Sequence, residues 1–263
     1  MNPPTTTNPV PVLELRQAAA RHRQEPEVMV ATGIDWTVQA GEFWVIAGEQ
    51  SAGTRDFLFV AAGLLPPADG TCRLFGTDTR ASESDRLADR LRTGFVFEDD
   101  QLFPELSLLD NIALPLFYHR DLAPETCAAT LAPLLERMEL TPIAHQRPDQ
   151  LSRNWRKRAS LARALALTPE LLFLDNPFHG LGAVHRQWWT RFLDDLARER
   201  KLTVVLATED LRPWAGNPRR QYALLHEGRF QPGGTWPEFS REHARLLQTL
   251  HAAAAPAPAE TEP

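Results

Sequence analysis

Cysteine is scarce in this sequence of 263 residues, and long apolar runs are absent from it. The two cysteines, Cys72 and Cys127, lack the paired spacing of zinc ligands, so we expect two free thiols in a reducing compartment rather than a metal site or a disulfide framework. No stretch approaches the roughly 18 uninterrupted apolar residues of a membrane-spanning helix. The segment from Met1 to Pro11 has no basic stretch followed by an apolar one, which argues against a signal peptide.

Positive charge is not in excess either. The formal net charge is −6, so the chain has no basic field with which to hold nucleic acid non-specifically, and no nucleic-acid partner is expected. Hydrophobic residues at 43% and charged residues at 24% are ordinary for a soluble globular protein, and a chain of this length can bury a substantial core. We therefore expect a cytoplasmic protein, unless a partner holds it at a membrane.

The two ends of the chain differ in composition from its middle. Residues 1–10 are rich in proline and threonine, and residues 252–263 are rich in alanine and proline. Such segments cannot build a core, so we predict a disordered tail at each end. No linker rich in serine or glycine interrupts residues 11–251, and we expect a single domain there.

Short apolar runs bounded by turn residues predict strands, and apolar residues recurring every three to four positions predict helices. The predicted strands are Val12–Leu15, Phe43–Ala47, Cys72–Phe75, Gly94–Phe97, Leu171–Leu174, Val204–Ala207 and Tyr222–His226. The predicted helices are Arg55–Leu64, Leu108–Tyr118, Pro124–Met138, Trp155–Leu167, Val184–Arg198 and Trp236–Leu250. This order predicts an α/β core with an antiparallel patch on its N-terminal side and a helical subdomain inserted at about 99–165.

A predicted strand runs through a glycine-containing loop into a predicted helix. The loop and the first helical turn read Gly48, Glu49, Gln50, Ser51, Ala52, Gly53, Thr54 and Arg55. Gly48 and Gly53 have the spacing of G-x-x-x-x-G-K-[ST], in which backbone N–H groups surround phosphates at a helix N-terminus. Thr54 stands in place of the lysine, and Arg55 replaces the hydroxyl that ligates magnesium, although a guanidinium has no acceptor atom. Asp56 adds a negative charge where a phosphate would lie.

Taken alone, this loop also fits any glycine-containing strand-to-helix turn, but further segments follow it. Glu98 comes at the end of one predicted strand, Asp175 and Asn176 at the end of another, and Glu209 just after a third. Before a basic predicted helix, the chain reads Leu151, Ser152, Arg153, Asn154 and Trp155. A carboxylate such as Asp175, at the end of a buried strand, can hold magnesium through water.

From residue 11 to about residue 250, the order of these segments resembles the ABC transporter ATPase family. The resemblance implies a P-loop NTPase core, ATP and Mg²⁺ as ligands, and a permease that holds the subunit at the inner face of the cell membrane. It also implies a head-to-tail dimer, in which the P-loop of one subunit meets the signature segment, here Leu151–Trp155, of the other. Residues 111–116, 119–122 and 175–178 look most like subunits serving lipid-transport permeases with mammalian-cell-entry partner proteins, and the alternative is a generic import or export cassette.

The same resemblance identifies the positions that depart from the family's pattern. The family's glutamine, two signature glycines and catalytic glutamate are replaced by Glu98, Arg153, Asn154 and Asn176; its loop aspartate and switch histidine are replaced by Gly182 and Glu209. An amide cannot serve as the base that activates water, and a carboxylate repels a γ-phosphate. No catalytic residue is therefore intact, while the metal ligand at Asp175 is kept.

These substitutions predict that hydrolysis is lost and that binding of ATP and Mg²⁺ is weak or absent. The leading hypothesis is a pseudo-ATPase subunit of a membrane transporter, which acts as a structural or regulatory partner of an intact cassette subunit or of a second copy. A second hypothesis is an active ATPase in which Arg55 replaces the lysine and Glu98 or Glu209 replaces the glutamate. A third is a soluble regulatory protein without a transporter.

Three further patterns complete the sequence predictions. The basic run Arg156–Arg158 at a helix start predicts a solvated face or a contact with the membrane subunit. The tryptophans at 188 and 189 predict packing in the core or against another subunit. His22 is the only ring at residues 20–25, where the family stacks adenine on an aromatic side chain.

Overall fold

The computed structural model describes residues 10–48 and 53–244. Apart from Val10, the predicted tails at 1–10 and 252–263 lie outside the described residues, and so do Glu49, Gln50, Ser51 and Ala52 of the predicted phosphate loop. The predicted helix Trp236–Leu250 is represented by α7 (Trp236–Glu242), and its residues from 245 onward are also outside this range.

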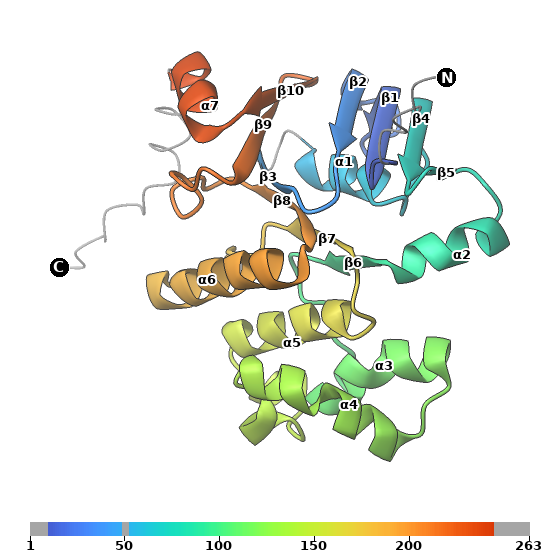
Figure 1. The fold of residues 1–263 in the computed structure, drawn as a ribbon, viewed down its shortest axis with the longest axis vertical. Coiled ribbons are helices and arrows are strands. Elements are labelled where there is room, and N and C mark those ends of the chain that lie inside the picture. The colour runs from blue at the N-terminus through green and yellow to red at the C-terminus, as the bar shows by residue number, and fades with distance from the viewer. Residues whose placement is uncertain (1–9, 49–52, 245–263) are drawn as a thin grey trace, which may run out of the picture.

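Two β-sheets form the frame of the molecule (Figure 1). The first is antiparallel, with the strand order β2-β1-β4-β5, and consists of β1 (Leu13–Arg21), β2 (Met29–Val38), β4 (Asp69–Leu74) and β5 (Thr77–Asp78). The second has the order β10-β9-β3-β8-β7-β6 and consists of β3 (Phe43–Ala47), β6 (Thr93–Val96), β7 (Leu171–Asp175), β8 (Thr203–Thr208), β9 (Arg220–His226) and β10 (Arg229–Gly234). Its strands are parallel except for β10, which pairs antiparallel with β9 at the edge.

The helices occupy both sides of the six-stranded sheet. They are α1 (Thr54–Ala61), α2 (Glu83–Leu91), α3 (Leu108–Arg120), α4 (Pro124–Arg137), α5 (Arg153–Leu165), α6 (Ala183–Arg200) and α7, with the 3₁₀ helices η2 (Thr141–Ile143) and η3 (Pro148–Gln150). In Figure 1, α3, α4 and α5 lie together in the lower part, and α6 lies between them and the sheets. Within residues 10–48 and 53–244, no helix combines the length and the apolar character needed to cross a membrane.

The alternation of side chains in β3 divides the core into two clusters. Phe43 and Val45 pack with apolar residues of α3, α5 and α6, whereas Trp44 and Ile46 pack with α1 and the antiparallel sheet. All five residues of β3 are buried, because a parallel strand covered on both faces needs apolar side chains on both. The helix α1 is thereby held between the two sheets, with its N-terminus at the end of β3.

The α/β core and the antiparallel patch predicted from the sequence are confirmed, but α2, β2, β5, β10 and the two 3₁₀ helices were not predicted. The helix α2 buries none of its residues and consists mostly of polar and charged side chains, although Ser82 caps its N-terminus. The strand β10 contains Pro232 and two glycines, which are tolerated because it lies at a sheet edge. The strand β2 carries a signal that could have revealed it, since Ile34, Trp36 and Val38 alternate with polar residues and are buried.

The prediction of a solvated basic face at 156–158 is wrong for Lys157 and Arg158, which are 2% and 4% exposed. The Cζ atom of Arg158 lies 3.6 Å from the ring centroid of Trp188 and 4.7 Å from that of Trp155. The same guanidinium donates a hydrogen bond of 2.7 Å to Glu139 Oε2. Trp189 is fully buried and Trp188 packs against the core, which confirms the predicted packing role of this pair. Arg158 therefore joins α5 to α6 and to the end of α4.

We predict that Trp188→Ala lowers the free energy of unfolding by about 2–3 kcal/mol, because it removes aromatic packing together with the cation–π contact to Arg158. Urea denaturation followed by circular dichroism measures the change. Val184→Ala on the same helix is the control, since Val184 is 78% exposed and its truncation should change stability by less than about 0.5 kcal/mol. Equal losses in the two variants would contradict the assignment of a packing role to Trp188.

Candidate functional site

The carboxyl ends of three parallel strands gather the predicted site residues at one edge of the sheet. Ala47 at the end of β3 lies opposite Thr208 of β8, and Asp175 at the end of β7 lies opposite Ala207. Such an edge is the usual ligand-binding position of an open parallel sheet. Gly53, with φ of 70°, turns the chain into α1, and a Cβ there would lie 2.5 Å from a methyl group of Val30.

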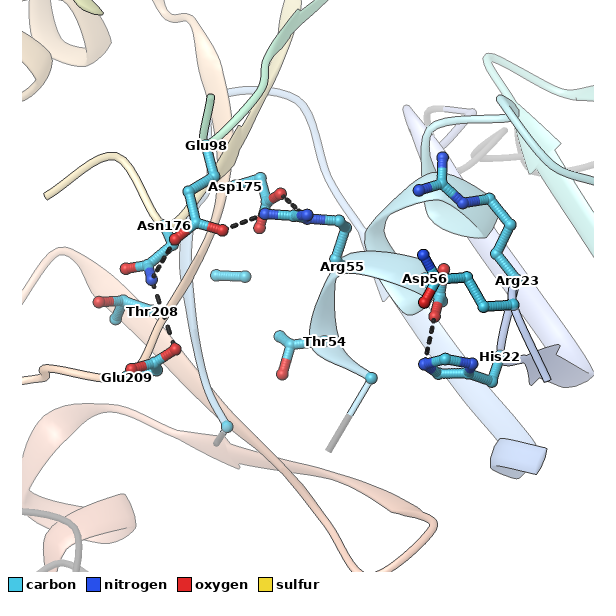
Figure 2. A pocket seen from close by; sticks show the side chains of 14 residues that line it. His22, Arg23, Thr54, Arg55, Asp56, Glu98, Asp175, Asn176, Thr208 and Glu209 are labelled. Carbon is cyan, nitrogen blue, oxygen red and sulfur yellow. Dashed lines mark hydrogen bonds and ion pairs between the residues drawn. The ribbon is translucent and has the colours of Figure 1, made fainter. Parts of the chain in front are cut away.

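A pocket opens at this edge of the sheet (Figure 2). It is lined by His22, Arg23, Gln24, Gly48, Gly53, Thr54, Arg55, Asp56, Glu98, Asp175, Asn176, Ala207, Thr208 and Glu209. The structure thus brings together the described part of the predicted phosphate loop and the residues predicted at the ends of three strands. The signature segment Leu151–Trp155 does not line this pocket; it leads into and forms the first turn of α5.

Arg55 is the counter-ion of two buried carboxylates. Its Nε donates to Asp175 Oδ2 at 2.7 Å, and its Nη2 donates to Glu98 Oε2. Asp175 is 4% exposed and Glu98 is 6% exposed. Burial alone would lower the pKa of Arg55, but the charges of Asp175 and Glu98 outweigh it, so its pKa is raised. Burial raises the pKa of Asp175 even though Arg55 opposes the shift.

The amide of Asn176 lies between two acidic groups, as Figure 2 shows. Asn176 Nδ2 donates to Glu98 Oε1 at 3.4 Å and to Glu209 Oε1 at 3.5 Å. His179, which the sequence did not single out for this site, places Nδ1 3.3 Å from Glu98 Oε1. A carboxylate at position 176 would face two like charges, so the amide is the group that fits here.

A second acidic group lies on the other side of α1. Asp56, 7% exposed, is in the first turn of α1, where the helix dipole favours a negative charge. His22 Nε2 lies 3.7 Å from Asp56 Oδ2. Arg23 places its Cζ 5.4 Å from the ring centroid of Phe59 instead of pairing with Glu98 or Asp175. His22 therefore serves as a partner of Asp56, and its ring is not arranged as an isolated stacking platform.

The described residues that line the pocket do not fit a magnesium–triphosphate group. Four carboxylates, those of Asp56, Glu98, Asp175 and Glu209, face two guanidinium groups, those of Arg23 and Arg55. A divalent cation bound by Glu98 and Asp175 would have to displace Arg55 from between them. The remaining acids would repel phosphate oxygens. Arg55, which the sequence offered as a phosphate ligand, instead neutralises the pocket's own carboxylates.

A buried lysine contacts the backbone of the loop that carries Asn176. Lys157 of α5 donates to the backbone carbonyls of Pro177 at 3.2 Å and Asn176 at 3.4 Å. Burial lowers the pKa of Lys157 to about 8, and the charge of Glu98 only partly opposes this shift. No pattern in the sequence indicates this contact, because Lys157 lies within a basic run that is typical of a solvated helix face.

The signature segment holds two side chains where the family has glycines. Arg153 is exposed and begins α5, and Ser152 before it forms no side-chain cap. Asn154 is 3% exposed, and neither polar atom of its amide has a hydrogen-bond partner among the described residues. Within one copy of the chain, the predicted signature residues therefore do not line the pocket.

The family model described as "ABC transporter" matches residues 31–179. The lipoprotein-releasing system ATP-binding protein LolD of Alcanivorax borkumensis is 32% identical over 84% of this chain and 97% of that protein. The pyoverdine export ATP-binding/permease protein PvdT of Pseudomonas aeruginosa is 33% identical over 94% of this chain, which spans only 42% of that longer protein.

Solved structures agree on the fold. The ATP-binding cassette MJ0796, described as a dimer bound to ADP and Pi, has a TM-score of 0.75 at 24% identity and covers 84% of this chain and 98% of its own. CbiO1 of Clostridium perfringens, described as part of the ABC transporter complex cbiONQ, has a TM-score of 0.74 at 21% identity, with 93% and 99% covered. The predicted fold class, the P-loop NTPase core of an ABC ATPase with an antiparallel patch, is thereby confirmed.

The lowered pKa of Lys157 predicts that stability rises with pH between about 8 and 10.5, because the unfolded chain binds a proton there that the folded one has released. Below pH 8 both states are protonated and the full burial cost is present. Relative to Lys157→Met, the wild type should gain about 2–3 kcal/mol of unfolding free energy across this window. Urea titrations at several pH values measure it, with Lys201→Met at an exposed position as the control. A parallel pH dependence of wild type and Lys157→Met would refute the prediction.

Proposed function

The chain belongs to the ABC transporter family, and from that premise we propose that it is a cassette subunit of a membrane transporter that does not hydrolyse ATP. In this proposal the subunit binds a permease at the cytoplasmic face of the membrane. It pairs with an intact cassette subunit or with a second copy of itself, and its role is structural or regulatory.

The contact of Arg55 with Glu98 and Asp175 is the observation that carries the proposal. A cassette that uses ATP needs a divalent cation to neutralise phosphate charge and to orient the reacting groups. Here the two carboxylates available for such a cation are already neutralised by a side chain of α1. Because the Arg55 guanidinium is covalently attached to the chain, it stays close to these carboxylates, and Mg²⁺ must displace it in order to bind.

The second support is the amide of Asn176, which stands at the position of the family's catalytic base. Asn176 carries an amide at the position of the family's glutamate, and an amide does not accept a proton from water. The alternative of an active ATPase would need Glu98 or Glu209 in this role. Glu98 is engaged by Arg55, and both carboxylates accept hydrogen bonds from Asn176. We therefore favour the non-hydrolysing subunit.

An apolar groove supports the transporter part of the proposal. It has a volume of about 570 Å³ and lies between α2, β6, α3 and α5. Leu87, Phe103 and Tyr118 line it and are 43%, 53% and 80% exposed. Exposed apolar side chains gathered in one groove are typical of a protein-binding surface. We assign this groove to an apolar segment of the permease.

The cargo is proposed from resemblance. Residues 111–116, 119–122 and 175–178 look like those of subunits that serve lipid-transport permeases. One relative is named as part of a lipoprotein-releasing system, although others are named for pyoverdine or macrolide export and for sulfate import. We propose a lipidic cargo, which co-purification of the transporter with bound lipid and its identification by mass spectrometry would test.

We predict that Arg55→Ser creates a divalent-cation site. Removal of the guanidinium leaves Glu98 and Asp175 without their counter-ion, which should lower the free energy of unfolding by about 3–5 kcal/mol. Millimolar Mn²⁺ or Mg²⁺ should then raise the melting temperature of Arg55→Ser and leave that of the wild type unchanged. Arg23→Ser, another pocket arginine with no contact to either carboxylate, is the matched control and should not respond to the metal.

Phosphate release and calorimetric titration with ATP complete this test. The wild type and Asp175→Ala should both stay at background turnover, and Thr54→Lys with Arg55→Ser should gain ATP binding without turnover, because Asn176 is unchanged. Wild-type turnover that disappears in Asp175→Ala or Arg55→Ala would establish the active ATPase instead.

For the groove, we predict that Phe103→Asp abolishes recovery of the chain with its permease from detergent-solubilised membranes, because a charge would be buried against an apolar segment. Val184→Asp, an exposed apolar position on α6, is the control and should leave recovery unchanged. Failure of the wild-type chain to recover any integral membrane protein would favour the regulatory protein without a transporter.

A further inference from the structure

The groove assigned to the permease contains charged side chains as well as apolar ones. Among the described residues that line it, Arg90, His119 and Arg163 are basic, and Glu83 is the only carboxylate. Glu83 accepts a hydrogen bond of 3.0 Å from Arg86 Nη2 and also pairs with Nη1 of Arg90. The negative charge of Glu83 is therefore used by arginines of its own helix, α2.

Arg163 of α5 lines the same groove without such a counter-ion. Its Nη2 donates a hydrogen bond of 3.1 Å to the backbone carbonyl oxygen of Asp100. The carboxylate of Asp100 pairs instead with Arg156, whose Nε lies 3.0 Å from Asp100 Oδ2. Across residues 10–48 and 53–244, Nε and Nη1 of Arg163 have no hydrogen-bond partner, and no salt bridge engages this arginine.

The surroundings of Arg163 make its positive charge costly to cover. The side chain is half-buried, and burial lowers its pKa although the charge of Asp100 opposes the shift. A segment that filled the groove with apolar side chains alone would exclude water from Arg163 without replacing the hydrogen bonds that water makes. Burial of an unpaired cation in this way is unfavourable. An occupant of the groove must therefore bring an acceptor to Arg163.

We propose that the permease segment bound in the groove carries an acidic side chain among its apolar ones, and that its carboxylate pairs with Arg163. This inference rests on the proposed assignment of the groove to the permease, and it adds the charge that the segment must carry. The apolar side chains of the segment pack against Phe97 and Phe103. The carboxylate accepts hydrogen bonds from the N–H groups of Arg163 that have no partner within the chain, and such charge-assisted bonds are strong.

The pair gives Arg163 a role in the choice of partner. A permease segment with a lysine at the same place would be repelled by Arg163, and one with an apolar residue would leave the guanidinium buried and unpaired. Arg90 does not make this distinction as strongly, because Glu83 already neutralises it. Arg163 therefore selects among apolar segments by the sign of the charge that they bring.

Site-specific photo-crosslinking identifies the occupant of the groove. A benzophenone-bearing amino acid replaces Tyr118, which lines the groove and is 80% exposed, and is activated in native membranes that contain the full chain. We expect mass spectrometry to show a cross-link to a segment of an integral membrane protein, with Asp or Glu within about four residues, or one helical turn, of the linked position. The same group in place of Val184, on α6 and outside the groove, is the control.

A charge exchange then tests the pair itself. Binding of the purified chain to the identified membrane protein in lipid nanodiscs is measured by biolayer interferometry. Arg163→Met should raise the dissociation constant at least about 30-fold, because it leaves the carboxylate of the partner buried without a counter-ion. Arg90→Met is the matched control and should change the constant by less than roughly threefold, since Arg90 lines the same groove but pairs with Glu83.

The reciprocal variant distinguishes pairing from a purely structural role of Arg163. Arg163→Glu should bind poorly to the wild-type permease, and replacement of the acidic residue of the permease by arginine should restore binding to within about threefold of the wild-type pair. Loss of the fold in Arg163→Glu would leave nothing for the second replacement to restore, so restoration itself shows that the charges meet.

The possible failures separate this inference from the proposed function. A cross-linked membrane segment without a nearby acid, an Arg163→Met variant that binds like the wild type, or a charge exchange that restores no binding overturns the Arg163 pair and leaves the groove as a permease surface. Cross-linking only to lipid or to a soluble protein, or no cross-link at position 118, overturns the assignment of the groove and this inference with it. Neither result bears on hydrolysis, which the turnover measurements decide.

Discussion

Two carboxylates buried at the edge of a parallel sheet require a counter-ion, and the rest of the site follows from that requirement. Val96 of β6 lies opposite Leu174 of β7, so Glu98 and Asp175 leave neighbouring strands side by side. Burial of unpaired negative charge in such a position is costly, and the counter-ion must be either a metal or a side chain. Arg55 supplies it from the first turn of α1. Because the cation is part of the chain, neutralisation is complete once the protein has folded and needs no ligand.

The other substitutions are consistent with this internal neutralisation. Asp56 suits the N-terminus of α1, which a phosphate would otherwise occupy, and the Asn176 amide separates Glu98 from Glu209 without adding a third charge. Positive charge appears instead at Arg153, on a face where glycine would let phosphate oxygens approach the backbone. The pocket thus has an excess of acidic groups where a triphosphate would favour positive charge, whereas Arg153 adds a positive charge at the signature segment.

Sequence reasoning placed the predicted residues at the ends of neighbouring strands, where the structure brings them together, but it did not determine their contacts. The apolar run Phe43–Ala47 ends next to Gly48, and two other apolar runs end next to or just before Asp175 and Glu209. Parallel pairing of the strands brings these ends together whatever the details of packing. The sequence does not show which way the Arg55 side chain points, because a guanidinium after a glycine loop can turn toward a phosphate or toward acids that are distant in sequence. Lys157 was misassigned for a similar reason, since its burial depends on the loop after β7 and not on its basic neighbours.

The apolar core explains how the fold stays stable around such a site. Both core clusters contain residues of the strands that flank the pocket. These residues are buried by contacts within the chain itself. Arg55 also ties α1, which packs between the sheets, to β7, a link that bound nucleotide and metal would otherwise have to provide. In the described residues, the side chains themselves provide this link. The groove at Leu87, Phe103 and Tyr118 adjoins the pocket along the chain, since Phe97 lines the groove and Glu98, the next residue, lines the pocket.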